Sequence, residues 1–213
     1  MEGLRGLVPP ALSIDLFEGR AYVGVVPFTM RTVRFGPFPI RDFLEANVRT
    51  YVHADGVPGV WFLSLDAESA FAVWGAKTLY SLPYFRARME SVGVEKGREY
   101  RSERLGKEEA SLDVHWKITD DRAHHAQAGT LEHFLTERYA LYGRRGRSGV
   151  YRLRVHHPPW PLRRASLERF ATTLLRAAGV SADRPIEPVL ASPEGVAVQT
   201  FAAEPVTMAY RLL

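Results

Sequence analysis

The stretch EANVRTYV, residues 45–52, is typical of a β-strand whose two faces differ in chemistry. Because side chains alternate across a strand, one face collects the polar residues Glu45, Asn47, Arg49 and Tyr51. The other face collects Ala46, Val48, Thr50 and Val52. A half-buried strand usually turns its polar face to water, but here the second face offers little area to bury. The stretch therefore fits either a solvated strand or one polar wall of a pocket inside a barrel.

Short strands and turns continue on both sides of this stretch. Apolar runs flank a turn at Glu18-Gly19 within residues 12–28, and others flank Asp55-Gly56 and Pro58-Gly59 within residues 47–65. Both patterns predict hairpins. Further strands are predicted at residues 70–75, 97–104, 111–118, 149–156, 195–201 and 206–212.

Two segments have the apolar period of a helix instead. The first covers residues 130–142, with Thr130 as N-cap, and the second covers residues 166–179, with Ser166 as N-cap and Gly179 as stop signal. A shorter helix is predicted within residues 76–90. Many strands with two or three helices predict an α+β, mainly β fold: a curved sheet or barrel with flanking helices, in one domain spanning residues 1–213.

The composition is that of a globular protein, with 46% hydrophobic and 24% charged residues in a chain of 213. The chain contains no cysteine, which excludes disulfides, thiolate metal sites and a cysteine nucleophile. No signal peptide and no apolar run near the ~18 residues of a membrane span is apparent, so we expect a cytoplasmic protein without a membrane partner. Lysine chemistry has four candidates: Lys77, Lys96, Lys107 and Lys117.

A second polar strand face is predicted at residues 149–156, where Arg152, Arg154 and His156 share one side. This face either is solvated or forms a second wall of the pocket. In the second case Arg152 and Arg154 would join Arg49 in binding an anion such as a carboxylate or a phosphate. His156 is also a candidate general base.

Common catalytic and cofactor motifs are absent from the chain. It has no G-x-S-x-G elbow, no P-loop and no G-x-G-x-x-G. Its paired histidines, His124-His125 and His156-His157, lack the spacing of metal ligands. No cofactor and no metal are therefore expected.

An alternative function rests on the arginine-rich segment 144–164. It holds seven arginines together with Tyr151 and Trp160, a pattern that can form a phosphate-binding stripe with a stacking platform. The net charge of the whole chain is only +4, which argues against nucleic acid as the main partner. A nucleic-acid-binding module is therefore kept as the second hypothesis.

Several segments, in order along the chain, resemble the YqjF-like family of bacterial proteins, which is grouped with acetoacetate decarboxylase. They are LSIDLFEGRAYVGVVPF (12–28), NVRTYV (47–52), PGVWFLSLDA (58–67), LPYFRARM (82–89), FLTERYALY (134–142) and VHHPPWPL (155–162). The resemblance implies the decarboxylase fold, a cone-shaped antiparallel β-barrel with flanking helices and an interior site. The family has no established activity, so the resemblance implies a fold and not a reaction.

The resemblance also bears on the chemistry of the site. The decarboxylase forms a Schiff base through a lysine that a second lysine makes acidic, in a segment shaped like G-x-P-K-K. In the similar stretch YSLPYFRARM, Pro83 fits but Tyr84 and Phe85 replace the lysine pair, which argues against imine-forming decarboxylation. The decarboxylase also has an active-site glutamate in a segment similar to FLEANVRTYV, where Glu45 is the matching residue. The resemblance therefore implies that Glu45 and its strand face point into the barrel.

Two further expectations come from the family. Its members usually carry an additional N-terminal stretch, rich in Trp and His, before the equivalent of LVPPAL at residues 7–12. The present chain begins close to that point, so we expect either a start codon assigned late or a site that lacks one wall. The decarboxylase relatives form oligomers, which leaves a homo-oligomer open.

The leading hypothesis is a barrel-like protein that binds a small polar anion resembling a carboxylate. The candidate ligand contacts are Glu45, Asn47, Arg49, Tyr51, Arg138 and His156. Arginines would neutralise the ligand, while Glu45 would accept a hydrogen bond or act as a base. No catalytic residue is assigned, and enzymatic activity is left open. A barrel packed solid with apolar side chains would instead favour a structural or partner-binding role.

Overall fold

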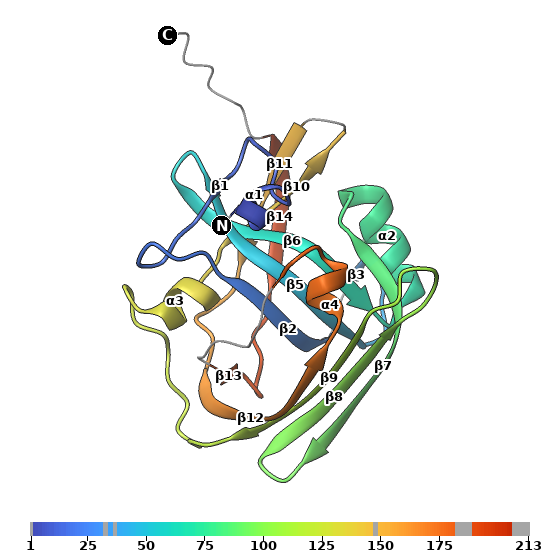
Figure 1. The fold of residues 1–213 in the computed structure, drawn as a ribbon, viewed down its shortest axis with the longest axis vertical. Helices are drawn as coiled ribbons and strands as arrows, with labels where there is room; N and C mark the ends of the chain where they lie inside the picture. The colour runs from blue at the N-terminus through green and yellow to red at the C-terminus, as the bar shows by residue number, and fades with distance from the viewer. Residues whose placement is uncertain (1, 32–33, 36–37, 147–148, 182–188, 206–213) are drawn as a thin grey trace.

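The computed structural model describes residues 2–31, 34–35, 38–146, 149–181 and 189–205. Strands dominate this part of the chain, and most of them join one curled sheet (Figure 1). The strands are β1 (Ser13–Ile14), β2 (Val23–Met30), β3 (Arg34–Phe35), β4 (Phe38–Pro39), β5 (Phe43–Ala54), β6 (Val57–Ala67), β7 (Tyr84–Val94), β8 (Gly97–Arg104), β9 (Ser111–Ile118), β10 (Ala140–Arg145), β11 (Gly149–His156), β12 (Arg163–Thr172), β13 (Leu190–Ala191) and β14 (Gln199–Pro205). The helices are α1 (Glu2–Arg5), α2 (Ala70–Tyr80), α3 (Leu131–Thr136) and α4 (Leu174–Ala177). The predicted mainly β fold is confirmed, as a sheet curled into a half-barrel.

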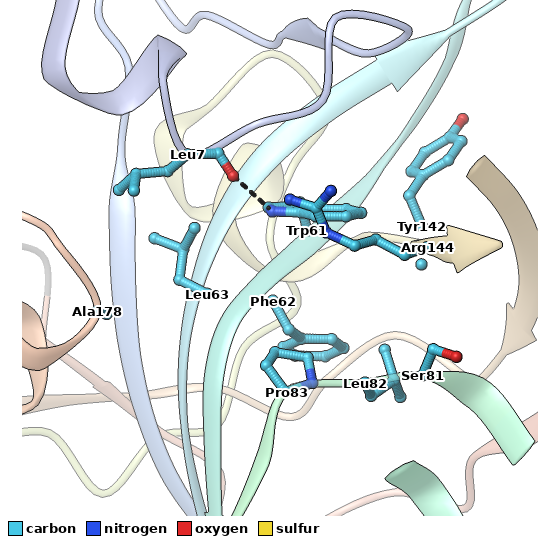
Figure 2. Close-up of a pocket in the computed structure, with 11 residues that line it drawn as sticks. Leu7, Trp61, Phe62, Leu63, Ser81, Leu82, Pro83, Tyr142, Arg144 and Ala178 are labelled. Atoms are coloured by element: carbon cyan, nitrogen blue, oxygen red, sulfur yellow. Dashed lines mark hydrogen bonds between the residues drawn. The ribbon is translucent and has the colours of Figure 1, made fainter. Parts of the chain in front are cut away.

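The large sheet forks at β6. One edge of β6 pairs with β5, and the far edge of β5 carries β1 and β2. The other edge of β6 is shared, because residues 60–61 pair with β10 and residues 65–67 pair with β7. One branch continues through β11 to β14, and the other through β8, β9 and β12 to β13. Figure 2 shows Trp61, Phe62 and Leu63 of β6 at this fork.

The turn between β5 and β6 sets the hairpin at the centre of the sheet. Asp55 and Gly56 have φ values of +50° and +73°, as a two-residue type I′ turn requires. This turn confirms the prediction at Asp55-Gly56, whereas Pro58 and Gly59 belong to β6. A Cβ added to Gly59 would lie 2.7 Å from the carbonyl oxygen of Ala140 on β10. Gly59 therefore allows β10 to approach β6 closely.

The first predicted hairpin differs from the observed pairing. Glu18 and Gly19 do form a turn, closed by hydrogen bonds of 3.0 Å between the backbones of Phe17 and Arg20. However, β1 and β2 follow one another along the same edge of β5, each paired with β5. Strand β5 is therefore paired with β1 and β2 along one edge and with β6 along the other.

Apolar clusters cover the face of β5 that carries Ala46 and Val48. These two side chains pack with Tyr100 of β8, Val114 of β9 and Leu174 of α4. The Tyr100 hydroxyl donates to the backbone carbonyl of Glu45 at 2.9 Å. The small side chains on this face are therefore buried across the curl of the sheet.

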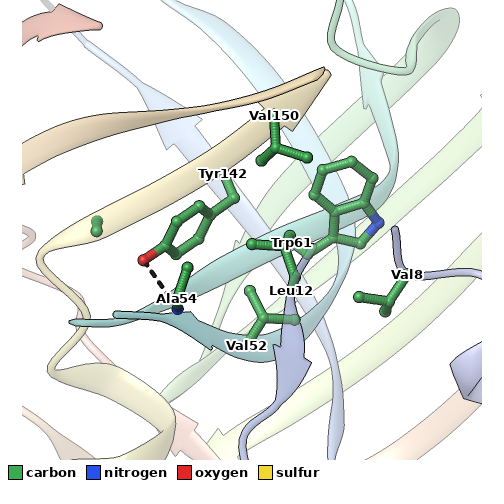
Figure 3. Packing of buried hydrophobic residues seen from close by; sticks show 8 residues of the cluster. Val8, Leu12, Val52, Ala54, Trp61, Tyr142 and Val150 are labelled. Carbon is green, nitrogen blue, oxygen red and sulfur yellow. Dashed lines mark hydrogen bonds between the residues drawn. The ribbon is translucent and has the colours of Figure 1, made fainter. Parts of the chain in front are cut away.

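A second cluster lies beyond Val52, at the end of the hairpin (Figure 3). Val52 packs there with Leu12, Trp61 and Tyr142. The Tyr142 hydroxyl donates to the carbonyl of Val57 at 2.8 Å and accepts from the amide of Ala54 at 3.3 Å. The N-terminal segment is thereby docked against the β5–β6 turn.

The predicted helix at residues 166–179 is wrong over most of its length. Residues 163–172 form β12, paired with β9, and only residues 174–177 are helical. The register with β9 shifts between Leu167 and Arg169, as at a β-bulge, which inserts an extra residue into one strand. Leu167 and Phe170 therefore pack against the same core at a spacing of three, which imitates the period of a helix.

Three other predicted elements differ in type from the structure over all or part of their length. Residues 70–75, predicted as a strand, begin helix α2, whose N-cap Ser69 accepts from the amide of Ala72 at 3.2 Å. The helix predicted at residues 130–142 ends at Thr136, and β10 follows. The helix predicted within residues 76–90 is the end of α2, followed by β7. The strand predicted at 195–201 begins at Gln199, and residues 206–212 lie outside the described residues.

Candidate ligand site on the polar face of β5

Strand β5 presents its polar residues on one covered face. Its pairing with β2 is uninterrupted from Thr50 to Phe43, so side-chain alternation holds along the strand. The polar face consists of Glu45, Asn47, Arg49 and Tyr51. Glu45, Asn47 and Tyr51 are 3%, 3% and 2% exposed, and Arg49 is half-buried. This face is therefore not the solvated side of an ordinary strand.

Glu45 is hydrogen-bonded to Tyr84, the first residue of β7. The Tyr84 hydroxyl donates to Oε2 of Glu45 at 2.9 Å. Burial raises the pKa of Glu45 to about 8, against the lowering effect of the Tyr84 hydrogen bond. Burial and the neighbouring Glu45 also raise the pKa of the Tyr84 hydroxyl. At pH 7 the pair therefore consists of a neutral carboxylic acid and a neutral phenol.

Two buried polar atoms follow Glu45 along the strand. Oδ1 of Asn47 and Nε of Arg49 have no hydrogen-bond partner among the described residues. Nη2 of Arg49 donates to the carbonyl of Leu135, at the end of α3, at 3.1 Å. Buried polar atoms in native proteins are rarely without a partner. In the row from Glu45 to Arg49, Oδ1 of Asn47 can therefore accept a further hydrogen bond from a bound molecule or water, and Nε of Arg49 can donate one.

Helix α3 and Arg138 close the other end of this face. The Phe134 ring lies 5.1 Å from the Tyr51 ring, measured between centroids. Cζ of Arg138 lies 5.2 Å from the Tyr51 centroid and 4.1 Å from that of Phe134. Nη1 of Arg138 also forms an ion pair with Oδ2 of Asp15 at 2.6 Å. Arg138 thus joins the predicted group, but Asp15 already neutralises its charge.

His156 is not brought together with these residues. Residues paired between neighbouring strands share a sheet face, and the pairs Tyr51–Val60, Val60–Leu141 and Leu141–Leu153 connect β5 to β11. Leu153 therefore lies on the face of Tyr51, and His156 lies on the opposite face. His156 is also exposed.

The same register corrects the predicted anion site of three arginines. Arg152 and Arg154 alternate with Leu153 along β11, so they lie on the face opposite Arg49. The two polar strand faces are therefore not two walls of one pocket. Arg49 is the arginine that stays with Glu45 and Asn47.

Comparison with known proteins places the chain in a family. The model of the DUF2071 family, described as "Uncharacterized conserved protein", matches residues 1–197. The chain belongs to the DUF2071 family. The uncharacterized protein YqjF of Bacillus subtilis (strain 168) is 37% identical to it over 182 residues, which is 84% of this chain and 74% of YqjF. The predicted YqjF-like membership is thereby confirmed.

Solved structures show which fold this DUF2071 protein has. Acetoacetate decarboxylase from Legionella pneumophila matches with a TM-score of 0.58 at 12% identity, over 100% of this chain and 82% of the decarboxylase. The enduracididine biosynthesis enzyme MppR, in complex with pyruvate, matches with a TM-score of 0.56 at 11% identity, over 97% and 84% of the two chains. At such identities the likeness shows the fold alone. The predicted decarboxylase-like fold is confirmed.

The hydrogen bond between Glu45 and Tyr84 joins two residues that the resemblance implies for the site. The resemblance matches Glu45 with the decarboxylase glutamate, and Tyr84 and Phe85 with its lysine pair. The fold brings Glu45 and Tyr84, 39 positions apart, into direct contact. An imine requires a primary amine, and a phenol stands here instead. The nearby Lys77 is exposed, with Nζ 5.3 Å from the centroid of Phe85.

The arginine-rich segment of this DUF2071 chain does not form one stripe. Its described arginines lie on β10, β11 and β12 or next to them, and β12 is separated from β10 by β9, β8, β7 and β6. Arg163 is paired with Glu194, and Arg147 lies outside the described residues. The predicted stacking residue Tyr151 is 6% exposed and donates its hydroxyl to the carbonyl of Tyr80 at 2.6 Å. Nothing in this arrangement supports the nucleic-acid hypothesis.

Three residues near the site were not assigned from the sequence. Tyr84 and Asp15 each bond to a predicted site residue. His157 is the buried member of its pair, stacked on Tyr139 at 4.6 Å between ring centroids. Alternation along 149–156 would have placed His157 on the buried face of Leu153. In the sequence, only the family resemblance, which places Tyr84 and Phe85 at the lysine pair, could have indicated Tyr84 as a site residue.

Within the described ranges, no three His, Asp or Glu side chains come together in a way that could hold a metal ion. None of the helices in that part of the chain is both long and apolar enough to cross a membrane.

Proposed function

We propose that this DUF2071 protein binds a small carboxylate-like anion against the polar face of β5 and does so without forming an imine. The observation that carries the proposal is the buried row of Glu45, Asn47 and Arg49. This row combines a neutral acid with an amide oxygen and a guanidinium nitrogen that both lack partners among the described residues.

Each member of the row supplies a different contact. The protonated Glu45 donates a hydrogen bond to an anionic oxygen, and such charge-assisted bonds are about twice as strong as neutral ones. Arg49 supplies the positive charge, because it has no carboxylate partner in the part of the chain that is described, whereas Arg138 is paired with Asp15. The Oδ1 atom of Asn47 accepts a hydrogen bond. The preferred ligand is therefore a small acid that also carries a hydroxyl or enol group.

Two further observations support this ligand class. The phenol of Tyr84 holds the Glu45 carboxyl in place but offers no amine to a carbonyl group, so binding is non-covalent at this position. MppR, which has the same fold, was solved in complex with pyruvate, a small oxo acid. Both favour recognition of a small acid over the decarboxylase reaction.

A thermal-shift screen tests the proposal. The probes are small hydroxy and oxo acids, 1,3-dicarbonyls, inorganic phosphate and a short oligonucleotide. A ligand at a hundred times its Kd adds about 2.7 kcal/mol to the free energy of unfolding, which raises the Tm of a chain this size by about 5–10 °C. We expect a shift with a small acid that Arg49→Ala abolishes and that the exposed control Arg88→Ala retains.

Two outcomes would contradict this function. An equal shift in the Arg49→Ala variant would place the ligand elsewhere. A response to the oligonucleotide alone, falling steeply with salt, would favour nucleic-acid binding instead.

A further inference from the structure

A cavity of about 210 Å³ lies at the fork of the sheet (Figure 2). Its walls include Leu7, Trp61, Phe62, Leu63, Pro83 and Arg144. The lining contains none of the polar residues of β5 and does not include Tyr84. This cavity is therefore a second candidate site, separate from the row of Glu45, Asn47 and Arg49.

The fork itself explains why a cavity is present here. Pairing of β6 with β10 reaches Trp61, and pairing with β7 begins at Leu65. Between these points residues 62–64 have β5 on one edge and no paired strand on the other among the described residues. The diverging strands leave room that side chains only partly fill. The site is thus built into the topology and does not depend on a mobile loop.

The walls of the cavity are mostly apolar, and they include one cation, Arg144. The Trp61 indole is held by a hydrogen bond from Nε1 to the carbonyl of Leu7 at 3.2 Å. The Tyr142 hydroxyl is engaged with the backbone of the β5–β6 turn. Cζ of Arg144 lies 5.6 Å from the centroid of the Trp61 ring, within the range of a cation–π contact. The cavity therefore combines a rigid aromatic wall with a guanidinium group.

Arg144 differs from other arginines of the sheet in its charge balance. Arg88, Arg101 and Arg169 each form an ion pair with a glutamate or aspartate. For Arg144, no carboxylate lies within ion-pair distance among the described residues, and its side chain is exposed. Its guanidinium group is therefore available to an anion beside the Trp61 ring.

We propose that this cavity binds a small aromatic carboxylate. Its volume lies below the roughly 300–1,000 Å³ of pockets for drug-sized ligands, so it suits a single ring with a short chain. The ring packs against Trp61 and Phe62, and the carboxylate accepts hydrogen bonds from Arg144. The proposal does not depend on the function proposed for the polar face of β5.

The test uses 3-phenylpropionate and the indole N–H signals of the ¹⁵N-labelled protein. The chain has four tryptophans, and Trp61 alone among them lines the cavity. We expect the ligand to shift the Trp61 signal, assigned by Trp61→Phe, and to leave those of Trp74, Trp116 and Trp160 in place. A Kd on the order of 1 mM is expected for so small a ligand. The uncharged analogue 3-phenylpropanamide and the aliphatic acid butyrate should each bind at least about tenfold more weakly.

Matched variants distinguish this site from the first. Arg144→Gln should raise the Kd about tenfold, because a charge-assisted hydrogen bond is lost. Arg145→Gln changes the next residue on β10, which is also exposed but points to the other face, and should leave the Kd unchanged. Arg49→Ala should also leave it unchanged. Backbone spectra of the variants establish that they are folded.

Three results would overturn the proposal. The first is an equal Kd in the Arg144→Gln and Arg145→Gln variants, and the second is equal binding of the acid and the amide. The third is loss of the Trp61 shift in Arg49→Ala, which would place the ligand at β5. If no small carboxylate binds at β5 but 3-phenylpropionate still shifts the Trp61 signal, only the function proposed for β5 is excluded.

Discussion

The hydroxyl of Tyr84 lies 2.9 Å from Oε2 of Glu45, and this hydrogen bond crosses the sheet over β6. Both groups are buried, and neither carries a charge at pH 7. A carboxylic acid held neutral in this way is a hydrogen-bond donor as well as an acceptor. The chemistry available at this end of β5 is therefore that of an acid and a phenol.

The free energy of unfolding should fall as the pH rises from about 4.5 to about 8. Glu45 has a pKa of about 8 in the folded protein and an ordinary value of 4.5 in the unfolded chain. Between these values the folded state binds the extra proton, so raising the pH favours unfolding. The stability contributed by protonated Glu45 is complete below pH 4.5 and is lost towards pH 8, at about 1.4 kcal/mol per pH unit.

Urea denaturation at pH 5, 6, 7 and 8 measures this loss. Glu45→Gln keeps the shape of the neutral acid without its titration, so the variant should lack that part of the slope. If the free energy of unfolding changes with pH in the same way in the wild type and in Glu45→Gln, Glu45 is already ionised at pH 5 in the folded protein.

Tyr84→Phe should raise the pKa of Glu45 further. The hydrogen bond from Tyr84 lowers the pKa of Glu45 by stabilising its charged form, and phenylalanine removes only that hydroxyl. The variant should also lose about 1–2 kcal/mol of stability, because a buried acceptor loses its donor. Carboxyl ¹³C NMR and denaturation measure the two effects. An unchanged pKa would show that the hydrogen bond is absent in solution.

Tyr84→Lys should make the site able to form an imine. The wild type has a phenol beside Glu45, so borohydride treatment with acetoacetate or pyruvate should leave its mass unchanged. The variant places a primary amine in a buried position, where desolvation lowers the pKa of lysine and increases its nucleophilicity. Mass spectrometry should then detect an adduct at position 84 only. An adduct of equal yield in the wild type would contradict this view of the site.

Arg138→Ala should destabilise the fold by about 2–3 kcal/mol. Arg138 is 8% exposed, packs between the rings of Tyr51 and Phe134, and pairs with Asp15. Its loss leaves a half-covered carboxylate without a partner. The control Arg88→Ala removes a solvent-exposed pair with Glu103 at 3.6 Å and should change stability by about 0.5 kcal/mol or less. Similar losses in the two variants would show that α3 is not anchored through Arg138.

Local patterns in the sequence predict strands well where both faces of the strand are distinct. The strands predicted at residues 45–52, 97–104 and 111–118 and the Asp55-Gly56 turn all reappear in the structure. The helical spacing of Leu167 and Phe170 misleads because a bulge in β12 produces the same spacing in a strand. A bulge depends on the partner strand, so no window of the sequence shows it.

Some of the residues of the site could be predicted from the sequence, again because side chains alternate along a strand. Alternation predicts that Glu45, Asn47 and Arg49 share a face, and the family resemblance implies that this face points into the barrel. Alternation does not show which faces of two distant strands meet. His156 was therefore expected beside Glu45, whereas the register places it on the opposite face. The parallel pair Val60–Leu141, which joins distant parts of the chain, decides this orientation. Such long-range pairing is determined by the packing of the whole sheet.

We propose that Glu45 is a neutral acid at one end of an anion-binding face. A ¹³C NMR titration of its side-chain carboxyl, assigned through Glu45→Gln, tests this claim most directly. Titration near pH 8 in the free protein is predicted, with a further rise when a small carboxylate is bound, because a nearby negative charge favours the protonated form. Titration near the ordinary value of 4.5, unaffected by carboxylates, would contradict it.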